Sequence, residues 1–480
     1  MTMPAPIAPD GGAATAPTLA LAQFAASLTG QALPSDIKVK LGELLLDYVR
    51  VASIGAGMSW SAWADSYMAD LGGQGRAAVL FRPHRRDAVR AAFLNATYAG
   101  SIDADDTHVG SMLHPGSIVF SAALALADEI DADGQAFVAA VAAGYEAMIR
   151  IALAIQPSHF QRGFQSTATC GGFGAAVAAA RLAFHGTAAA DHKIASTIGL
   201  VASFSGGLTR FYFSGSTVKR IHAARAAENG VAATLLARHG FAGPEDIIEG
   251  ANGFACAYAD SVDFKRITQD LGTDYVLREV TVKGHACSAR VQAAVEGIFA
   301  LCRTHHIDPD RIADILIGIP TVIRGRLTIP QPIDVQAAQM SLPHSAALAA
   351  AIGPVDDGFA LSVADYERSL GDPRVKRIEK LVRCEVHSQV EAATTAAAVP
   401  ARVTITLTDG SKHSVFVPAP KGSPSRPFSH DDHVARFRRE LANRFTAHAC
   451  DQIVEIAENL ADLDKVRRLT DLLTVAVAGP

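Results

Sequence analysis

The sequence is short of cysteine and of positive charge, and each shortage excludes a class of protein. Six cysteines in 480 residues are too sparse for a disulfide-stapled fold, and none forms the Cys-x-x-Cys pair of a zinc ribbon or a thioredoxin-like redox site. The chain has 43 basic against 48 acidic residues, a net charge of −5. This balance gives no electrostatic reason to expect a nucleic-acid partner, which needs a basic surface.

The start of the chain also lacks the features of a targeting segment. No Lys or Arg precedes Lys38, so the basic region of a secretory signal and the arginines of a transit peptide are both missing. The longest apolar stretch, 137–155, contains Glu146 and Arg150, whereas a membrane-spanning helix needs about 20 predominantly apolar residues. We therefore expect a globular, cytoplasmic protein with reduced thiols and no membrane contact.

The first half of the chain has the composition and periodicity of a helical domain. Residues 1–17 contain Pro, Gly and Ala with almost no charge and are expected to form a loose leader. Beyond them, alanine-rich stretches with apolar residues at helical spacing predict an all-helical domain over 18–276. Its helices are expected at 19–28, 35–54, 86–100, 117–129, 134–155, 170–185, 189–206 and 222–239.

Strand patterns begin after residue 276. Residues 312–319 form a short β-branched run that ends at Pro320. Over 403–408, apolar residues alternate with threonine before an Asp-Gly turn and a second apolar run, which is the pattern of a β-hairpin. Helical patterns at 287–304 and 338–352 intervene, so 277–422 is predicted to be a smaller α+β domain.

The last segment, 423–480, is helical again, and Ser429 is placed to cap its first helix. The expected fold class is therefore mainly α with an α+β insertion. A large all-helical domain is interrupted by the smaller domain, and the last helices return to the first.

The segment Asp103-Ala-Asp-Asp-Thr-His108 is a polar break between two helical patterns, and His114-Pro-Gly-Ser follows it. Three carboxylates in four residues repel one another, which raises at least one pKa if they are buried, and a nearby imidazole would complete an acid/base set. Two other interpretations stay open. The segment could be a solvated loop that caps the next helix, or an Mg²⁺ or Ca²⁺ site, although it lacks the spacing of an EF-hand.

Two more segments place glycine or basic residues at a helix start. Residues 162–174 are polar and glycine-rich, which suits either anion binding by free N–H groups or close helix packing. Their glycines do not fit the dinucleotide-binding pattern, and no strand precedes them. Lys219 and Arg220 stand at a helix start, where the helix dipole favours acids, so they indicate either an anionic ligand or a solvated pair.

A second basic cluster, 281–290, lies at the predicted domain boundary and contains Lys283, Cys287 and Arg290. A lysine in a strand is usually at the surface, and a lone cysteine is more often a buried filler than a nucleophile.

Taken together and in this order, these segments resemble the MmgE/PrpD family over about residues 20–475. The motifs that carry the resemblance are the Asp103-to-Thr107 segment, His114-Pro-Gly-Ser117, Arg162-Gly-Phe, Gly215-x-Thr-x-Lys219, Lys283-x-x-x-Cys287, Met340-Ser-Leu-Pro-His344 and Lys421-Gly-Ser-Pro424. The resemblance implies a large helical domain, a smaller α/β lid and an active site in the cleft between them, usually in a homodimer. It also implies a lyase or isomerase that acts on a small polycarboxylate substrate with no cofactor and no metal.

The resemblance assigns residues to this site one by one. Asp103 and Thr107 match the family's acidic motif, His114 its His-Pro segment, Lys219 the lysine after Gly-x-Thr and Lys283 the lysine of the lid motif. The four expected catalytic residues are Asp103, His114, Lys219 and Lys283. Thr107, Gln165, Thr167 and His222 are expected to bind substrate.

The chemistry expected of this site is proton removal from a carbon next to a carboxylate. The two lysines would bind the carboxylate and stabilise the enolate-like dianion. Asp103, with a pKa raised by crowding, and His114, which titrates near neutrality, would transfer protons. His114 would also help a leaving hydroxide depart.

The predicted function is that of a hydro-lyase similar to 2-methylcitrate dehydratase. An epimerase of the iminodisuccinate type, a cis-aconitate-type decarboxylase and a non-catalytic helical binding protein stay as alternatives. Two departures argue against the decarboxylase. Gln165 stands where many relatives carry His, and no Tyr occurs near 320–326, where the decarboxylases place an active-site Tyr.

Overall fold

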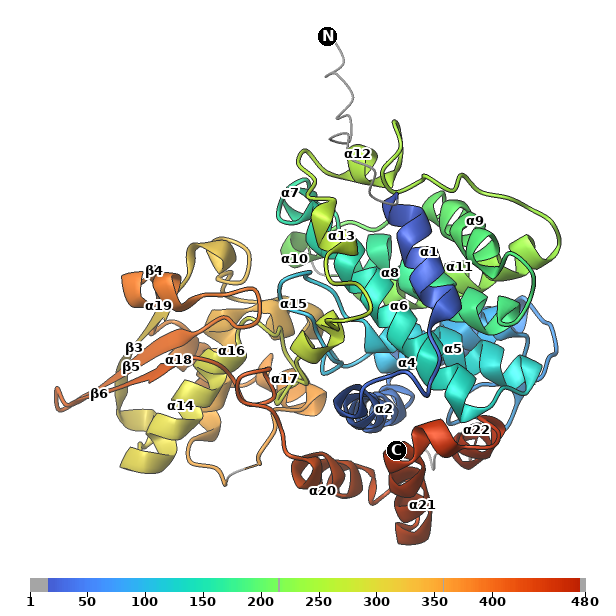
Figure 1. The fold of residues 1–480 in the computed structure, drawn as a ribbon. Coiled ribbons are helices and arrows are strands. Elements are labelled where there is room, and N and C mark those ends of the chain that lie inside the picture. The colour runs from blue at the N-terminus through green and yellow to red at the C-terminus, as the bar shows by residue number, and fades with distance from the viewer. Residues whose placement is uncertain (1–15, 215, 357, 475–480) are drawn as a thin grey trace.

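The computed structural model describes residues 16–214, 216–356 and 358–474, and it consists of a large helical domain beside a smaller α/β domain (Figure 1). The expected fold class, mainly α with an α+β insertion, is confirmed. Residues 1–15 of the predicted leader lie outside the described part. The first helix, α1 (Pro17–Ser27), begins at the leader's last residue.

The centre of the helical domain is the crossing of α6 (Gly134–Ile155) with α8 (Ser166–Phe184). Their backbones approach closely, since a Cβ on Gly144 would lie 2.7 Å from the carbonyl oxygen of Gly174. The glycines at 171–174 therefore serve helix packing, and they lie inside α8 rather than at its start. Both helices are long and apolar enough to cross a membrane, but 94% of each apolar window is buried within the chain, as core helices require.

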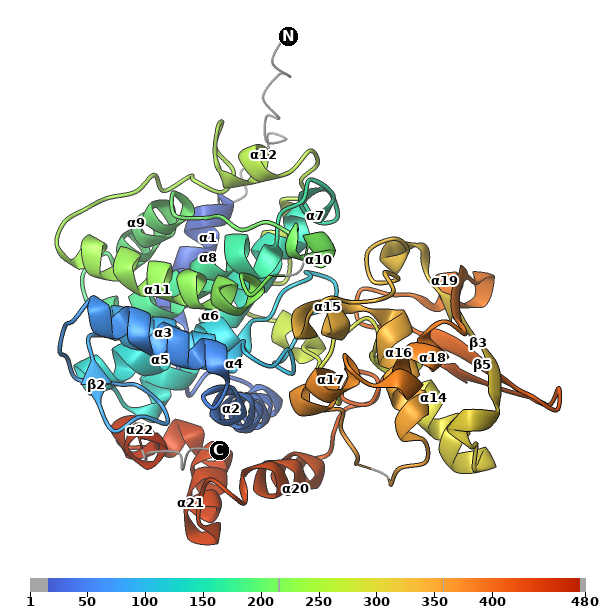
Figure 2. The same cartoon turned by 180° about the vertical axis from the view of Figure 1, so that it is seen from behind.

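The other elements of this domain surround α6 and α8, with α11 packed against α8 and α4 beside α11 (Figure 2). They are α2 (Ser35–Gly55), α3 (Ser59–Asp70), α4 (Ala88–Ala99), α5 (Gly116–Ile130), α7 (Ser158–Gln161), α9 (Ala190–Ala202), α10 (Phe211–Ser214), α11 (Lys219–Arg238), α12 (Phe254–Tyr258) and α13 (Lys265–Thr268), together with the two-residue strands β1 (Ala77–Ala78) and β2 (Arg85–Arg86).

The smaller domain is a four-stranded sheet covered by helices. Its strands are β3 (Ile312–Ile319), β4 (Val382–Val386), β5 (Ala401–Leu407) and β6 (Lys412–Val417), in the order β4-β3-β5-β6, with β3 and β4 parallel and the other pairs antiparallel. The predicted hairpin is β5–β6, and Gly410 supplies the positive φ of +85° at its turn. The helices are α14 (Gln292–His305), α15 (Val335–Met340), α16 (Leu342–Ile352), α17 (Val363–Ser369), α18 (Pro373–Glu379) and α19 (Ser388–Ala393).

The last helices return to the helical domain, as predicted. They are α20 (His430–Leu441), α21 (Ala447–Glu458) and α22 (Arg467–Leu473), which run beneath α2 in Figure 1. Ser429 caps α20 in a capping box with Asp432. Phe437, Leu441 and Ile453 join the core of the helical domain, whereas the core of the smaller domain begins at Cys287.

Two helices begin earlier than the sequence pattern predicted. Helix α8 starts at Ser166 instead of residue 170, because the side chain of Gln165 accepts a hydrogen bond from the backbone N–H of Ala168 and caps it. Helix α11 starts at Lys219 instead of residue 222. In both cases the polar residues that define the site form the first turn of a helix rather than a loop before it.

Candidate active site

Three segments meet at the boundary between the domains: the loop from residue 101 to 115 that joins α4 to α5, the segment 281–290, and the first turn of α11. A two-residue bridge links the first two, because Thr107 and Thr281 exchange backbone hydrogen bonds of 2.8 Å each. This bridge brings Lys283 next to Asp103, although 180 residues separate them in the chain.

A buried carboxylate with two lysines is the centre of the site. Asp103 is 0% exposed, and its Oδ1 accepts hydrogen bonds from Lys219 Nζ at 2.6 Å and from Lys283 Nζ at 3.0 Å. The backbone carbonyl of Asp103 also accepts from Lys283 Nζ, at 2.8 Å. Asp103 has a φ of +54°, and this left-handed conformation is tolerated by Asp better than by most residues.

The charged groups of this cluster shift one another's pKa values. Burial alone would raise the pKa of Asp103, but Lys219 and Lys283 outweigh it and hold that pKa well below its usual range. Burial lowers the pKa of Lys219, and Asp103 only partly opposes this effect. For Lys283, burial is outweighed by Asp103 and Asp105, so its pKa is raised. The expectation that crowding raises the pKa of Asp103 was therefore wrong, because two ammonium groups surround this carboxylate.

The crowded carboxylate with a raised pKa is Asp106. Burial raises the pKa of Asp106 to about 7, although hydrogen bonds from Tyr145 OH and from the backbone N–H of Gly116, both 2.7 Å, oppose this shift. These bonds direct the Asp106 side chain to the start of α5. It does not line the cavity described below.

His114 lies beside the lysine pair with one ring nitrogen engaged. Its Nδ1 is 3.0 Å from Thr107 Oγ1, 3.1 Å from the Asp106 carbonyl oxygen and 3.6 Å from Asp105 Oδ1. These oxygens favour a proton on Nδ1, which leaves Nε2 as the basic nitrogen. Burial lowers the pKa of His114 to about 4, so the ring is neutral at pH 7. His114 is therefore placed to accept a proton and not to donate one, contrary to the expectation that it titrates near neutrality.

A small cavity connects these side chains. Its polar wall consists of Asp103, Thr107, His114, Gln165, Tyr212, Lys219, Ser288 and Arg290, and its apolar wall includes Val109, Met112, Phe160 and Met340. The cavity volume is about 50 Å³.

The structure brings most of the predicted site residues together. Asp103, His114, Lys219, Thr107 and Gln165 line the cavity, and Lys283 lies directly behind Asp103. The side-chain oxygen Oε1 of Gln165 caps α8, so the side-chain N–H₂ group is the part that faces the cavity. Gly215, which opens the lysine motif, lies outside the described residues.

Two residues predicted to bind substrate do not line the cavity. Thr167 accepts a hydrogen bond of 3.1 Å from the backbone N–H of His114 through its Oγ1, so it holds the His114 backbone from behind. His222 is buried one turn into α11 with its ring against Phe211, and its Nδ1 has no hydrogen-bond partner within the described residues. Neither side chain reaches the space that a substrate would occupy.

Two cavity residues received no role from the sequence. Tyr212 comes from the short helix α10, and Arg290 from the second basic cluster. The basic cluster indicated Arg290 as a candidate. No sequence pattern indicated Tyr212, which lies in an aromatic stretch without periodicity.

Three of the acidic and imidazole groups could in principle hold a metal ion, since ligand atoms of Asp103, Asp105 and His114 lie within 4.8 Å of one another. The donor set argues against this use. Lys283 Nζ lies 3.0 Å from Asp103 Oδ1 and 3.6 Å from Asp105 Oδ1, and Lys219 Nζ lies 2.6 Å from the same Asp103 oxygen. A divalent cation would have to displace two ammonium groups, so these residues do not fit a metal.

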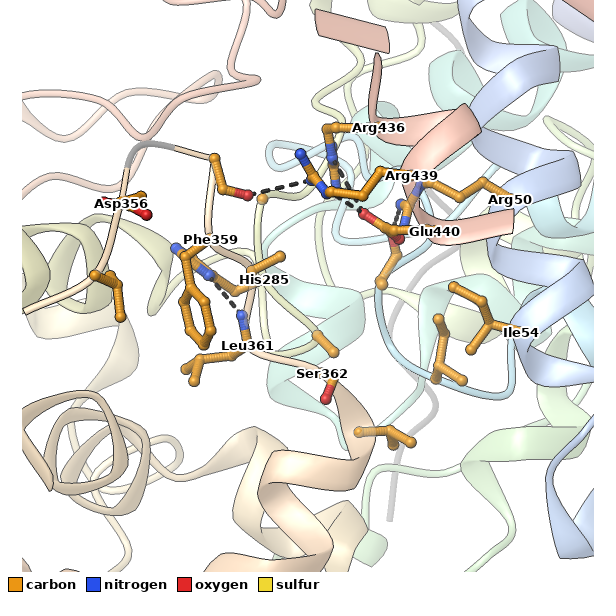
Figure 3. A pocket seen from close by; sticks show the side chains of 18 residues that line it. Arg50, Ile54, His285, Asp356, Phe359, Leu361, Ser362, Arg436, Arg439 and Glu440 are labelled. Atoms are coloured by element: carbon orange, nitrogen blue, oxygen red, sulfur yellow. Dashed lines mark hydrogen bonds and ion pairs between the residues drawn. The ribbon is translucent and has the colours of Figure 1, made fainter. Parts of the chain in front are cut away.

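A larger cavity, of about 650 Å³, adjoins the 101–115 loop (Figure 3). Ile102 and Ala104, the chain neighbours of Asp103, line it, and none of the predicted site residues does. Its arginines support the backbone of the site: Arg436 Nη2 donates a 3.1 Å hydrogen bond to the Lys283 carbonyl oxygen, and Arg50 forms a 2.7 Å ion pair with Glu440. The larger volume of this cavity therefore does not by itself identify it as the candidate active site.

Comparisons with known proteins match both domains of the chain. The profile described as the MmgE/PrpD N-terminal domain matches residues 19–267, and that of the MmgE/PrpD C-terminal domain matches residues 285–462. The cis-aconitate decarboxylase of Aspergillus terreus is 24% identical over an alignment of 486 positions, which covers 97% of this chain and 96% of that protein. The enzyme of that name from Mus musculus is 24% identical over 446 residues, 90% of this chain and 88% of the other.

A cis-aconitate decarboxylase-like protein of Aspergillus oryzae is 28% identical over 312 residues. This match spans 62% of the present chain and 63% of the Aspergillus oryzae protein. The two profile matches and the two cis-aconitate decarboxylases extend over both domains.

The protonation state of His114 can be measured directly. We expect the ring to titrate with a pKa near 4, because burial disfavours the charged imidazolium. The measurement is an NMR titration of ¹³C-labelled histidine rings in the ligand-free protein, with the His114 signal assigned by its loss in His114→Gln. A titration near the ordinary value of 6.5 would contradict the assignment of His114 as a neutral base.

Proposed function

Because the chain belongs to the MmgE/PrpD family, we propose that it is a cofactor-independent lyase that removes water from a small hydroxy-polycarboxylate. Family membership and the cis-aconitate decarboxylase relatives support the coarser statement, a lyase-type activity on polycarboxylates. The finer assignment, dehydration, rests on the side chains that face the cavity.

The observation that carries the proposal is the Asp103 carboxylate with Lys219 and Lys283 on one of its oxygens, next to a neutral imidazole. A carbon next to a carboxylate is a weak acid, so its deprotonation needs positive charge where the enolate-like dianion forms. The two ammonium groups supply that charge in a closed cavity with little water, where electrostatic interactions are strong. Asp103 holds both lysines in place and stays ionised.

The proposed reaction uses one base and one acid. His114 Nε2 takes the proton from the carbon next to the carboxylate, and the electron pair of that C–H bond forms the new C=C bond. The C–O bond of the neighbouring hydroxyl breaks, and Lys219 donates a proton so that water leaves. Lys219 suits this role because burial lowers its pKa toward neutrality, whereas neutral His114 has no proton to give on Nε2.

The low pKa of His114 in the empty cavity does not prevent it from acting as a base. A bound polycarboxylate adds negative charge next to the ring and thereby raises its pKa. Thr107 Oγ1 and the Asp105 carboxylate, near Nδ1, orient the ring and stabilise the imidazolium that forms.

A second candidate, decarboxylation of cis-aconitate, is favoured by the names of the relatives. That reaction requires a proton to be delivered to carbon after CO₂ leaves. Gln165 cannot supply it, since an amide does not titrate at neutral pH. Epimerisation of a dicarboxylate would use the same proton removal without loss of water.

The role of Lys219 predicts a large loss of turnover in Lys219→Ala. One charge-stabilising donor contributes about 10²–10³-fold to the rate, and we expect kcat to fall by that factor. The thermal midpoint should move little, since Asp103 keeps its bonds to Lys283. Lys412→Ala, at an exposed position on β6, is the matched control and should leave both quantities unchanged. Normal specific activity of Lys219→Ala would show that Lys219 is only structural.

Product analysis separates the two candidate reactions. Incubated with citrate, 2-methylcitrate and cis-aconitate, the wild-type protein should form an unsaturated product and water from a hydroxy acid, as followed by ¹H NMR, and release little CO₂. Gln165→His should raise CO₂ release from cis-aconitate or change its pH profile, because the new imidazole titrates near about 6–7. Strong CO₂ release by the wild type, with no dehydration of any hydroxy acid, would replace the dehydratase proposal with the decarboxylase.

A further inference from the structure

One wall of the active-site cavity carries positive charge without a matching acid. Arg290 lines the cavity, yet no carboxylate within residues 16–214, 216–356 and 358–474 forms an ion pair with it. Its contacts with the described residues are long: Nη2 lies 3.4 Å from the Val109 carbonyl oxygen, and the guanidinium lies 5.8 Å from the centre of the Phe160 ring. Arg290 therefore differs from Lys219 and Lys283, which both contact Asp103.

A second guanidinium adds to this charge. Arg326, from the smaller domain, lies 4.3 Å from the centre of the same Phe160 ring, and its Nη1 lies 3.4 Å from the Phe160 carbonyl oxygen. It also forms no ion pair within the described residues. Burial lowers the pKa of Arg290, and the charge of Arg326 adds to this effect. Two cations that crowd one ring without an acid are costly, and an anionic ligand would remove that cost.

A hydroxyl group lies next to these cations. Tyr212 packs edge-on against Phe160, with ring centres 6.4 Å apart, and stacks on Phe211 at 4.5 Å. Its ring is therefore fixed, while its hydroxyl makes no hydrogen bond to any part of the chain that the structure describes. Tyr212 and Arg290 both line the same cavity.

We propose that Arg290 and Tyr212 form a second carboxylate subsite, which binds the substrate carboxylate farthest from the reacting carbon, with Arg326 adding positive charge. The inference rests on the proposed function, in which the charges of Lys219 and Lys283 stabilise the enolate-like dianion that forms at the carboxylate next to that carbon. A guanidinium offers two parallel N–H donors that match the two oxygens of a carboxylate, and the Tyr212 hydroxyl can donate a third hydrogen bond.

The subsite determines which substrates are accepted. A ligand with a third carboxylate gains the charge-assisted bonds to Arg290, whereas a dicarboxylate leaves the arginine unpaired. Arg290 and Tyr212 are thus the residues that select tricarboxylates over dicarboxylates. Phe160 contributes by holding both arginines against its ring.

The test uses binding, so that it does not depend on turnover. Propane-1,2,3-tricarboxylate has no hydroxyl to eliminate and serves as the tricarboxylate probe. Methylsuccinate (propane-1,2-dicarboxylate), which lacks only the far carboxylate, serves as the dicarboxylate probe, and both are measured by isothermal titration calorimetry. Arg290→Gln should weaken tricarboxylate binding by about 10–100-fold, the range for a lost hydrogen bond to a charged group, and methylsuccinate binding by less than about 3-fold. Tyr212→Phe should give a smaller loss in the same direction.

Two further variants separate the subsite from general effects. Arg290→Lys keeps the charge but loses the planar pair of donors, so its affinity for the tricarboxylate should fall between those of wild type and Arg290→Gln. Arg374→Gln, at an exposed position on α18, is the matched control and should bind both probes as the wild type does. Thermal midpoints of all variants confirm that they are folded.

The outcomes distinguish this subsite from the function on which it rests. If Arg290→Gln binds both probes as tightly as the wild type, or loses affinity equally for both, the subsite is wrong while the proposed function stands. If the wild type binds neither probe, the polycarboxylate function fails and the subsite fails with it. A selective loss of tricarboxylate binding in Arg290→Gln supports the inference.

Discussion

The rest of the site depends on one buried interaction, the Asp103 carboxylate that accepts hydrogen bonds from two lysines of different segments. Two ammonium groups meet at one oxygen of this carboxylate, and Asp105 Oδ1 lies 3.6 Å from Lys283 Nζ, so two buried acids face two lysines. The lysines keep Asp103 ionised and place positive charge beside the cavity. This interaction also fixes the path of the chain, because the loop after α4, the start of α11 and the segment of Lys283 must all converge there.

The same segments tie the two domains together. Gln339 of α15 is fully buried and donates from its Nε2 to the carbonyl oxygens of Ile102 and Ala286, while its Oε1 accepts from Arg220. Arg436 of the returning helix α20 holds the Lys283 carbonyl from the other side. Residues of the insertion and of the C-terminal return therefore support the backbone on which the reacting groups stand.

The sequence predicted the repetitive features well and the local electrostatics poorly. Helices such as α6 and the β5–β6 hairpin follow from periodicity and turn residues. Tyr212 could not be found, because an aromatic residue in an irregular stretch has no pattern that reports where its ring points. The pKa of Asp103 was predicted in the wrong direction, since the nearest charges along the chain are acids and the decisive lysines come from 116 and 180 residues away.

The central claim is that a proton next to a substrate carboxylate is removed in the cavity beside Asp103, Lys219 and Lys283. The most direct measurement is ¹H NMR of a hydroxy-tricarboxylate in D₂O with wild type and His114→Gln. The account predicts that the wild type replaces the proton on the carbon next to the carboxylate with deuterium, or removes it with water, and that His114→Gln does neither at a comparable rate. The account would be contradicted if His114→Gln eliminated water at the wild-type rate. It would also be contradicted if the wild type neither eliminated water nor exchanged the proton.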